Sequence, residues 1–240
     1  SHYNDLFRCE EPYFSRRGKG SAKEFVAKYC ENYAKTNGRG LICIPSGNHD
    51  MDRLARTLDP EEMKIAFAFL LSMPGAPFIY YGDEIGMRYV ENLTSVEGGY
   101  NRTGSRSPMQ WNTSANAGFS SAPSEKLYVP VDPDRNRPNA EKEMADDTSL
   151  YSEVKRLIAF RMAHPALQSM AAIHFCSDED PLVYERTCDE EKILVIIHPA
   201  DRKVVVPDVK GEILYTVGGN ASVTEAGIAV DGGTAVFLAL

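Results

Sequence analysis

Asn48, His49 and Asp50 are consecutive in the chain, and Arg53 follows three residues later. An imidazole, a carboxylate and a guanidinium in one short segment can hydrogen-bond sugar hydroxyls or stabilise positive charge that develops at a reacting carbon. The same polar residues are also common at the start of a loop, where Asp50 would only cap a turn. Their spacing alone leaves both interpretations open.

The elements around this segment indicate where it lies in a fold. A helix is expected over residues 22–35, and the apolar run at 41–44 is typical of a strand buried on both faces. Asp59-Pro60 predicts the start of a second helix that Pro74-Gly75 ends, and a second buried strand follows over 77–81. This alternation indicates a parallel βα architecture, in which polar residues at the carboxyl ends of strands face the ligand crevice.

The second half of the chain has a different pattern. Residues 86–148 are rich in Gly, Pro, Asn, Ser and Asp and predict a long loop, and a helix is expected from about residue 149 to His164-Pro165. From about Ala171 onward, short β-rich runs predict an antiparallel β-domain. The predicted runs are 182–184, 192–197, 203–206 and 213–215, with a hairpin of 228–230 and 235–238 around Asp231-Gly232-Gly233.

The composition excludes several classes of protein. The 240 residues include 34 acidic and 26 basic side chains, a net charge of −8, which argues against nucleic-acid binding. No stretch approaches the roughly 18 apolar residues of a membrane span, and the N-terminus lacks the features of a secretion signal. The five cysteines show no ligand spacing, so we expect reduced thiols in a cytoplasmic protein.

We expect neither a metal ion nor a cofactor. The segment from Asp132 to Glu143 mimics a calcium loop, but Arg137 stands where the sharp turn of that loop needs glycine. Gly18-Lys19-Gly20-Ser21 lacks the preceding strand of a phosphate loop. Several aromatic residues could stack on sugar rings, although one of two neighbouring strand tyrosines must face the core; they are Tyr80, Tyr81, Tyr100, Trp111 and Phe119.

Three motifs carry a resemblance to a known family. SGNHDMDR at residues 46–53 resembles the seventh-strand Asn-His-Asp motif of the α-amylase family, glycoside hydrolase family 13. GAPFIYYGDEIGM at 75–87 is similar to the eighth-strand motif of that family. GYNRTGSRSPMQW at 99–111, with NAGFS at 116–120, resembles the branch of α-glucosidases, oligo-1,6-glucosidases and trehalose synthases. The resemblance covers essentially the whole chain.

The resemblance implies a fold and a division into domains. The family fold is a (β/α)8 TIM barrel followed by an antiparallel β-sandwich. Residues 1–170 are therefore expected to form the C-terminal part of the catalytic barrel, with the long loop at 86–148, and residues 171–240 the β-domain. The barrel lacks its N-terminal portion in this interpretation, and the strands left without neighbours should make the chain self-associate.

The resemblance also assigns roles to individual residues. Asp50 corresponds to the carboxylate that grips the sugar at the cleavage subsite and favours the transition state. His49 would hydrogen-bond the same sugar, Asn48 would hold the geometry of the strand end, and Arg53 and Arg106 would reach the substrate or its gate. The implied substrate is an α-glucoside or oligosaccharide.

Two carboxyl groups of a retaining glycosidase are missing from this pattern. The nucleophile and the acid/base lie about 5 Å apart, and in the family their motifs precede the Asn-His-Asp motif. Only 47 residues precede Asn48, and they contain no Gly-x-Arg-x-Asp pattern. We therefore expect a C-terminal fragment of an α-glucan-active enzyme that is inactive alone. The alternative is a non-catalytic α-amylase-like module that binds carbohydrate or a protein.

Overall fold

The computed structural model describes residues 6–240, which divide into two compact units. Of the described residues, unit 1 comprises 6–44, 57–77 and 156–240, and unit 2 comprises 45–56 and 78–155. The predicted division into a barrel part and a β-domain at residue 170 stays a prediction. Each unit is described by itself.

The two strands predicted to be buried pair with each other, but the prediction of burial is wrong: Cys43 and Phe78 are exposed, and only Ile44 is buried. Strand β1 is Cys43–Pro45 and strand β2 is Ala76–Phe78, and together they form a two-stranded sheet. The Ala76 N–H donates to the Ile42 carbonyl (3.3 Å) and the Ser46 N–H to the Phe78 carbonyl (2.8 Å). The hydrogen-bonded residues increase in number along both strands in the same direction, so β1 and β2 run parallel. Both strands are shorter than predicted, so Tyr80 and Tyr81 lie beyond the end of β2.

The sequence predicts the helix between these strands correctly, because its ends carry strong local signals. Helix α2 is Pro60–Ser72 and begins with a capping box between Asp59 and Glu62. It ends at Met73, whose backbone is extended, before Pro74-Gly75. Gly75 has φ +93°, and a Cβ there would lie 1.9 Å from the Ile42 carbonyl oxygen. Only glycine allows the chain to enter β2 this close to β1.

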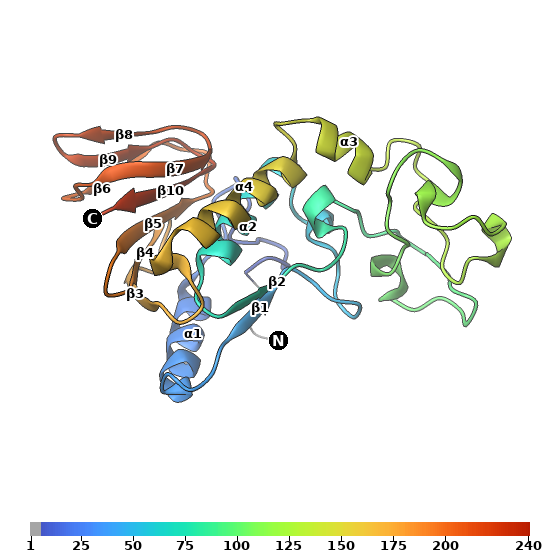
Figure 1. Ribbon diagram of the computed structural model, residues 1–240, viewed down its shortest axis with the longest axis horizontal. Helices are drawn as coiled ribbons and strands as arrows, with labels where there is room; N and C mark the ends of the chain where they lie inside the picture. Colours follow the sequence, from blue (N-terminus) through green and yellow to red (C-terminus); the bar gives the residue numbers. More distant parts are fainter. Residues whose placement is uncertain (1–5) are drawn as a thin grey trace. The chain divides into compact units, whose positions relative to one another are not determined.

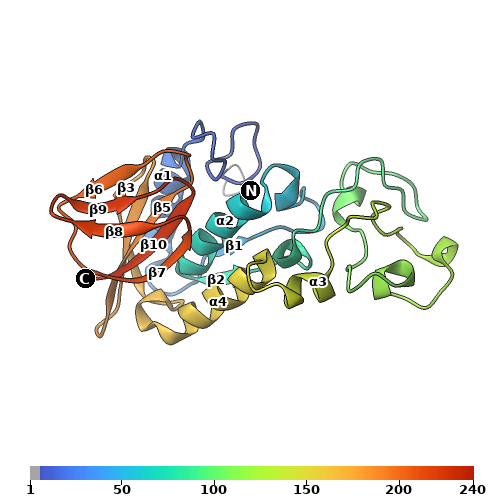
Figure 2. The ribbon, with the colours of Figure 1, turned by 90° about the horizontal axis from the view of Figure 1, so that it is seen from above.

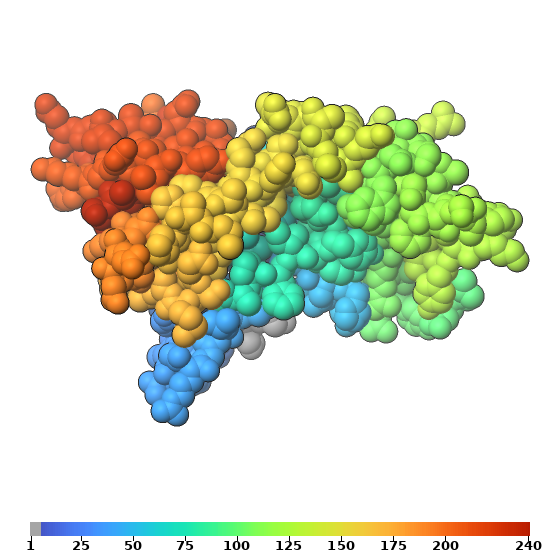
Figure 3. All heavy atoms as spheres, viewed as in Figure 1, coloured from blue at the N-terminus to red at the C-terminus, as the bar shows by residue number. Residues whose placement is uncertain are grey.

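The remaining helices are mostly short. Helix α1 is Lys23–Thr36, close to its predicted range, and α4 is Leu150–Ala163. In Figure 3 helix α1, drawn in blue, projects from the rest of unit 1, and residues 30–36 are largely exposed. Residues 86–148 contain one α-helix that the sequence analysis missed, α3 (Ala140–Ala145). The 3-10 helices are Leu54–Arg56, Asp83–Ile85, Thr103–Ser105, Ala115–Gly118, Ser124–Lys126 and Pro165–Leu167.

The C-terminal segment forms two antiparallel sheets (Figure 1). The first has the order β3-β4-β5-β10-β7 and the second β6-β9-β8. Their bounds are Ala172–Ser177 (β3), Leu182–Thr187 (β4), Lys192–His198 (β5), Val204–Pro207 (β6), Glu212–Gly218 (β7), Ala221–Thr224 (β8), Gly227–Val230 (β9) and Thr234–Ala239 (β10). Strands β3 and β8 were not predicted. The sheets share a core that includes Val183, Ile196, Ile228, Val230 and Val236.

The predicted hairpin of 228–230 and 235–238 is wrong. Strand β9 pairs with β6 and β8, whereas β10 pairs with β5 and β7. Both strands present apolar side chains to the core between the sheets, so they face each other across it instead of sharing one sheet. The turn Asp231-Gly232-Gly233 carries the chain from one sheet to the other.

The five-stranded sheet is covered on its second face by α2 (Figure 2). The rings of Phe69 and Tyr184 meet edge to face at 6.4 Å, and the Ser72 hydroxyl lies 2.6 Å from the Tyr184 hydroxyl. This explains why β4 and β5 are buried along most of their length instead of alternating. In the part of the chain that the structure describes, no helix has the length and apolar character needed to span a membrane.

Candidate active site

Asp50 lies in the loop that follows β1, within unit 2. Its backbone N–H donates to the Asn48 Oδ1 at 2.8 Å, so Asn48 shapes the turn that carries it. The Asp50 carboxylate is about half exposed, and its Oδ1 accepts hydrogen bonds from Arg102 (3.2 Å) and Arg106 (3.0 Å). The His49 Nε2 lies 3.3 Å from the other carboxylate oxygen. The site therefore presents an accessible carboxylate between two guanidinium groups and an imidazole.

Hydrogen bonds of the Arg106 side chain and of the two residues next to it hold Arg106 in place. Its Nε donates to the His49 carbonyl at 2.8 Å. The Tyr81 hydroxyl donates to the Ser107 carbonyl at 2.8 Å, and the Tyr80 hydroxyl to the Ser105 carbonyl at 3.3 Å. These bonds join the loop after β2 to the loop that carries Arg106, which fixes the guanidinium beside Asp50.

Of the four predicted site residues, the structure brings together Asp50, His49 and Arg106. It adds Arg102, which the sequence analysis missed. A signal was present, because Arg102 lies four residues before Arg106 in the same motif. The 3-10 helix Thr103–Ser105 between them turns both guanidinium groups toward Asp50.

Arg53 is not with the other three, because its side chain is completely buried. The guanidinium lies over the rings of Tyr80 and Tyr81, 4.6 and 4.7 Å from their centroids. It donates to the Tyr81 carbonyl and, at 3.2 Å, to Asp83, whose side chain is also completely buried. An enclosed guanidinium cannot touch a sugar. Arg53 therefore lies beneath the loop and does not make the predicted direct contact with the substrate.

Ser46 connects this buried pair to the parallel strands. Its hydroxyl donates to the second Asp83 carboxylate oxygen at 2.7 Å and accepts from the Tyr80 N–H at 2.8 Å. The ends of β1 and β2 are thus tied together by one polar network of Ser46, Arg53, Tyr80 and Asp83. These bonds hold the two strand ends together, whereas the Nε and Nη2 atoms of Arg53 have no hydrogen-bond partner among the described residues.

Comparison with known proteins decides the family. The family model described as alpha amylase, catalytic domain, matches residues 19–170, more than half of the chain. The chain belongs to the α-amylase family, glycoside hydrolase family 13. Within it, the relatives fall in the branch of α-glucosidases, oligo-1,6-glucosidases and trehalose synthases.

Two relatives illustrate the likeness of this α-amylase-family chain. The trehalose synthase/amylase TreS of Mycobacterium tuberculosis is 42% identical over 120 residues, 48% of this chain and 19% of the relative. The oligo-1,6-glucosidase of Parageobacillus thermoglucosidasius is 29% identical over 209 residues, 71% of this chain and 36% of the relative. The chain therefore spans well under half of the curated relatives it matches.

Solved structures share the fold. A MutB mutant in complex with the substrate sucrose matches with a TM-score of 0.77 and 23% identity, over 91% of this chain and 46% of that one. A mutant of the trehalulose synthase MutB in complex with Tris matches with a TM-score of 0.79 over 99% of this chain and 50% of that one. The chain covers about half of each structure.

Arg106, which contacts Asp50, also lines a cleft with aromatic walls in this α-amylase-family chain. Its volume is about 470 Å³, and its lining includes Tyr81, Arg106, Trp111, Phe119 and Tyr128. Trp111, Phe119 and Tyr128 are each about half exposed. Aromatic rings that stay exposed beside a guanidinium can stack on the apolar face of a sugar whose hydroxyls bind the charged group.

Glu84 also lines this cleft. Burial raises the pKa of its carboxyl group above the ordinary value. The residues described by the structure contain no group of His, Cys, Asp and Glu that could hold a metal ion. In the calcium-like segment, Asp132 and Asp134 instead contact Arg88, at 3.3 and 2.9 Å.

Proposed function

We propose that this chain is part of a retaining α-glucan-active enzyme and that Asp50 grips the sugar at the point of cleavage. The observation that carries the proposal is the half-exposed Asp50 carboxylate, which lies after a parallel strand between Arg102 and Arg106. Carboxylate oxygens accept hydrogen bonds from two neighbouring hydroxyls of one sugar ring. The two guanidinium groups orient the Asp50 carboxylate, which suits a group that stabilises positive charge in the transition state.

We further propose that the 240 residues do not cleave the bond by themselves. Besides Asp50, a retaining mechanism needs two further carboxyl groups about 5 Å apart, one as the nucleophile and one as the acid/base. Two other acidic side chains of the motifs already have a partner: Asp52 pairs with Arg56, and Asp83 is completely buried against Arg53. The nucleophile and the acid would come from other parts of the enzyme.

Activity measurements test both statements. The 240-residue chain is assayed on maltose, isomaltose and trehalose beside a version extended upstream to a full barrel. We expect turnover only in the extended protein, and a loss of at least about 100-fold in kcat for Asp50→Asn there, because a removed transition-state contact costs about 10²–10³. Asp134→Asn is the matched control, a similarly exposed aspartate paired with Arg88. Turnover by the short chain would overturn the second statement, and full activity of Asp50→Asn the first.

A second candidate function has an observation in its favour. The human amino acid transporter heavy chain SLC3A1 is 30% identical over 182 residues, 74% of this chain and 25% of that protein. A non-catalytic module that binds carbohydrate or a protein would use the same fold. An extended protein that binds sugar but shows no turnover would favour this candidate.

We also propose a cytoplasmic location and a tendency to self-associate. All five cysteines are unpaired and four of them are exposed, which suits a reducing compartment. At the two-stranded sheet, Leu41 is 50% and Phe78 60% exposed. Exposed apolar residues beside strands with unpaired edges favour contact with a second copy.

A further inference from the structure

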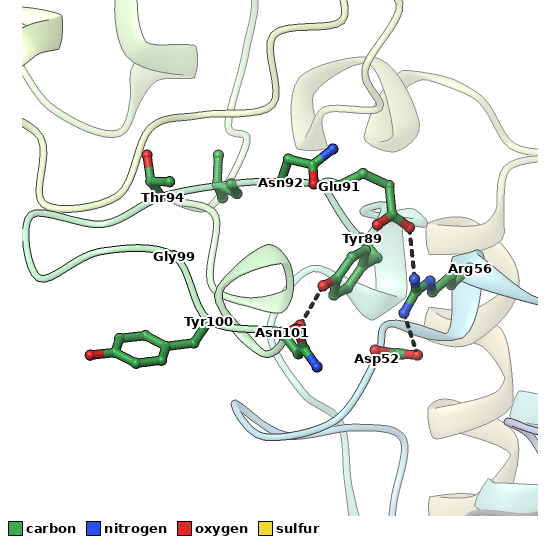
Figure 4. Close-up of a pocket in the computed structure, with 10 residues that line it drawn as sticks. Asp52, Arg56, Tyr89, Glu91, Asn92, Thr94, Gly99, Tyr100 and Asn101 are labelled. Carbon is green, nitrogen blue, oxygen red and sulfur yellow. Dashed lines mark hydrogen bonds and ion pairs between the residues drawn. The ribbon is translucent and has the colours of Figure 1, made fainter.

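Unit 2 contains a second, larger concavity. It lies between the segment 89–94 and the returning segment 99–101, and its volume is about 690 Å³ (Figure 4). This volume is in the range of small-molecule sites. The two segments are joined at the far end by reciprocal backbone bonds between Ser95 and Gly98. We call this concavity the hairpin pocket.

At one end of the hairpin pocket the side chains contact one another. The Arg56 guanidinium donates to Asp52 (2.7 Å) and Glu91 (2.8 Å) and lies 4.1 Å from the centre of the Tyr89 ring. The Tyr89 hydroxyl donates to the Asn101 carbonyl. Figure 4 shows these side chains gathered at one end, with Thr94 and Tyr100 at the other. A ligand at this end would therefore meet groups that are already joined by hydrogen bonds and ion pairs.

The lining selects the chemistry of the ligand. Asp52, Arg56 and Glu91 together carry a charge of −1, so an anion such as a phosphate is disfavoured. The rest of the lining offers amide and hydroxyl groups, including those of Asn92 and Thr94. Hydrogen-bonding groups around an aromatic ring suit a neutral ring that carries hydroxyl groups on its rim and C–H groups on its face.

Tyr100 supplies the aromatic ring. It is 57% exposed, so part of its ring can contact a ligand. The pocket also adjoins the Asp50 site along the chain, because Asp52 lies two residues after Asp50 and Asn101 directly precedes Arg102.

We propose that the hairpin pocket binds a hexose ring of an α-glucan, separate from the ring at Asp50, with Tyr100 stacked on its face and Glu91 hydrogen-bonded to its hydroxyls. The choice of an α-glucan rests on the proposed function; the pocket itself does not. The Asp50 site and the pocket use different residues, and the Arg102 guanidinium of the Asp50 site lies 5.9 Å from the centre of the Tyr100 ring, so both sites are followed in the same chain.

The experiment is a titration of the 15N-labelled 240-residue chain with maltotriose, followed by backbone amide shifts. We expect saturable shifts at Gly99, Tyr100 and Asn101. Tyr100→Ala should weaken the apparent Kd at these amides about tenfold, as loss of a stacked ring does, and Glu91→Gln several-fold. Val96→Ala is the control, since Val96 is 74% exposed and lies outside the pocket lining.

Each outcome bears on one statement. Saturable shifts at 99–101 that persist in Asp50→Asn and weaken in Tyr100→Ala support the hairpin pocket. Shifts confined to Asp50 and Arg106 would overturn it and leave the proposed function intact. Shifts confined to 99–101 would support the pocket and count against sugar binding at Asp50. Equal affinity of the wild type, Tyr100→Ala and Glu91→Gln would also overturn the pocket.

Discussion

Replacing Asp83 with asparagine should destabilise unit 2 severely, although Asp83 touches no sugar in the proposed site. Asp83→Asn keeps the size of the side chain and removes its charge. The Arg53 guanidinium, 3.2 Å away, would then be a buried charge without its counter-ion. Coulomb's law at an effective dielectric constant of about 20 gives about 5 kcal/mol for unit charges at this separation. Breaking buried ion pairs costs about 3–5 kcal/mol.

The lower end of that range is expected here, because Arg53 keeps its bond to the Tyr81 carbonyl and its two aromatic faces. Each aromatic contact of this kind retains about 0.5–2 kcal/mol. We expect a loss of about 3 kcal/mol in the free energy of unfolding. The matched control is Asp50→Asn, whose half-exposed ion pairs should contribute less than about 1 kcal/mol.

Urea unfolding measures the difference. Trp111 is the only tryptophan and lies in unit 2, so its fluorescence reports the unit that contains Asp83. With a slope of about 1–3 kcal/mol per molar, the midpoint should fall by about 1–3 M for Asp83→Asn. Adding Arg53→Met to Asp83→Asn should recover part of the loss, because no buried charge then remains. Equal midpoints for Asp83→Asn and Asp50→Asn would refute the reasoning.

Three further predictions concern other parts of the chain. Asp59→Ala should cost about 1 kcal/mol by urea unfolding, because it removes the cap of α2; a loss no greater than that of the exposed Glu61→Ala would contradict it. Glu84→Gln should raise the free energy of unfolding at pH 8 and not at pH 4. Burial raises the pKa of the folded carboxyl above 4.5, so the ionised form of Glu84, present at pH 8, destabilises the folded state, whereas the neutral form at pH 4 does not. The same gain at both pH values would be inconsistent with this. Sedimentation velocity should show dimers or larger species that Phe78→Ser reduces, and a monomer at all concentrations would argue against the exposed strand edges as contact sites.

Several elements were predictable because their signals are local. The capping box at Asp59, the turn at Pro74-Gly75 and the apolar run before Pro45 act within a few residues, so the strand-helix-strand order followed from the sequence. The position of Asp50 after a strand followed from the same order. The motifs around Asp50 are specific enough to indicate the family from the order of the residues alone.

Other features depend on contacts between distant segments. Asp231-Gly232-Gly233 has the composition of a hairpin turn, and only the pairing of β9 with β6 and β8 shows that it joins two sheets. Arg53 has the residue type of a substrate ligand, but Asp83, thirty positions away, and the two tyrosine rings enclose it. Spacing along the chain carries no information on either arrangement.

The sequence by itself determined the family, the order of the first strands and helices, and the presence of a carboxylate, an imidazole and Arg106 for one site. The tertiary structure decided which of these groups stay accessible. Asp50 remains half exposed because its partners, Arg102 and Arg106, come from a loop at the surface, whereas Arg53 is drawn beneath it by a buried carboxylate and two aromatic rings. Burial depends on what packs against a side chain, and that is settled only when segments far apart in the sequence come together.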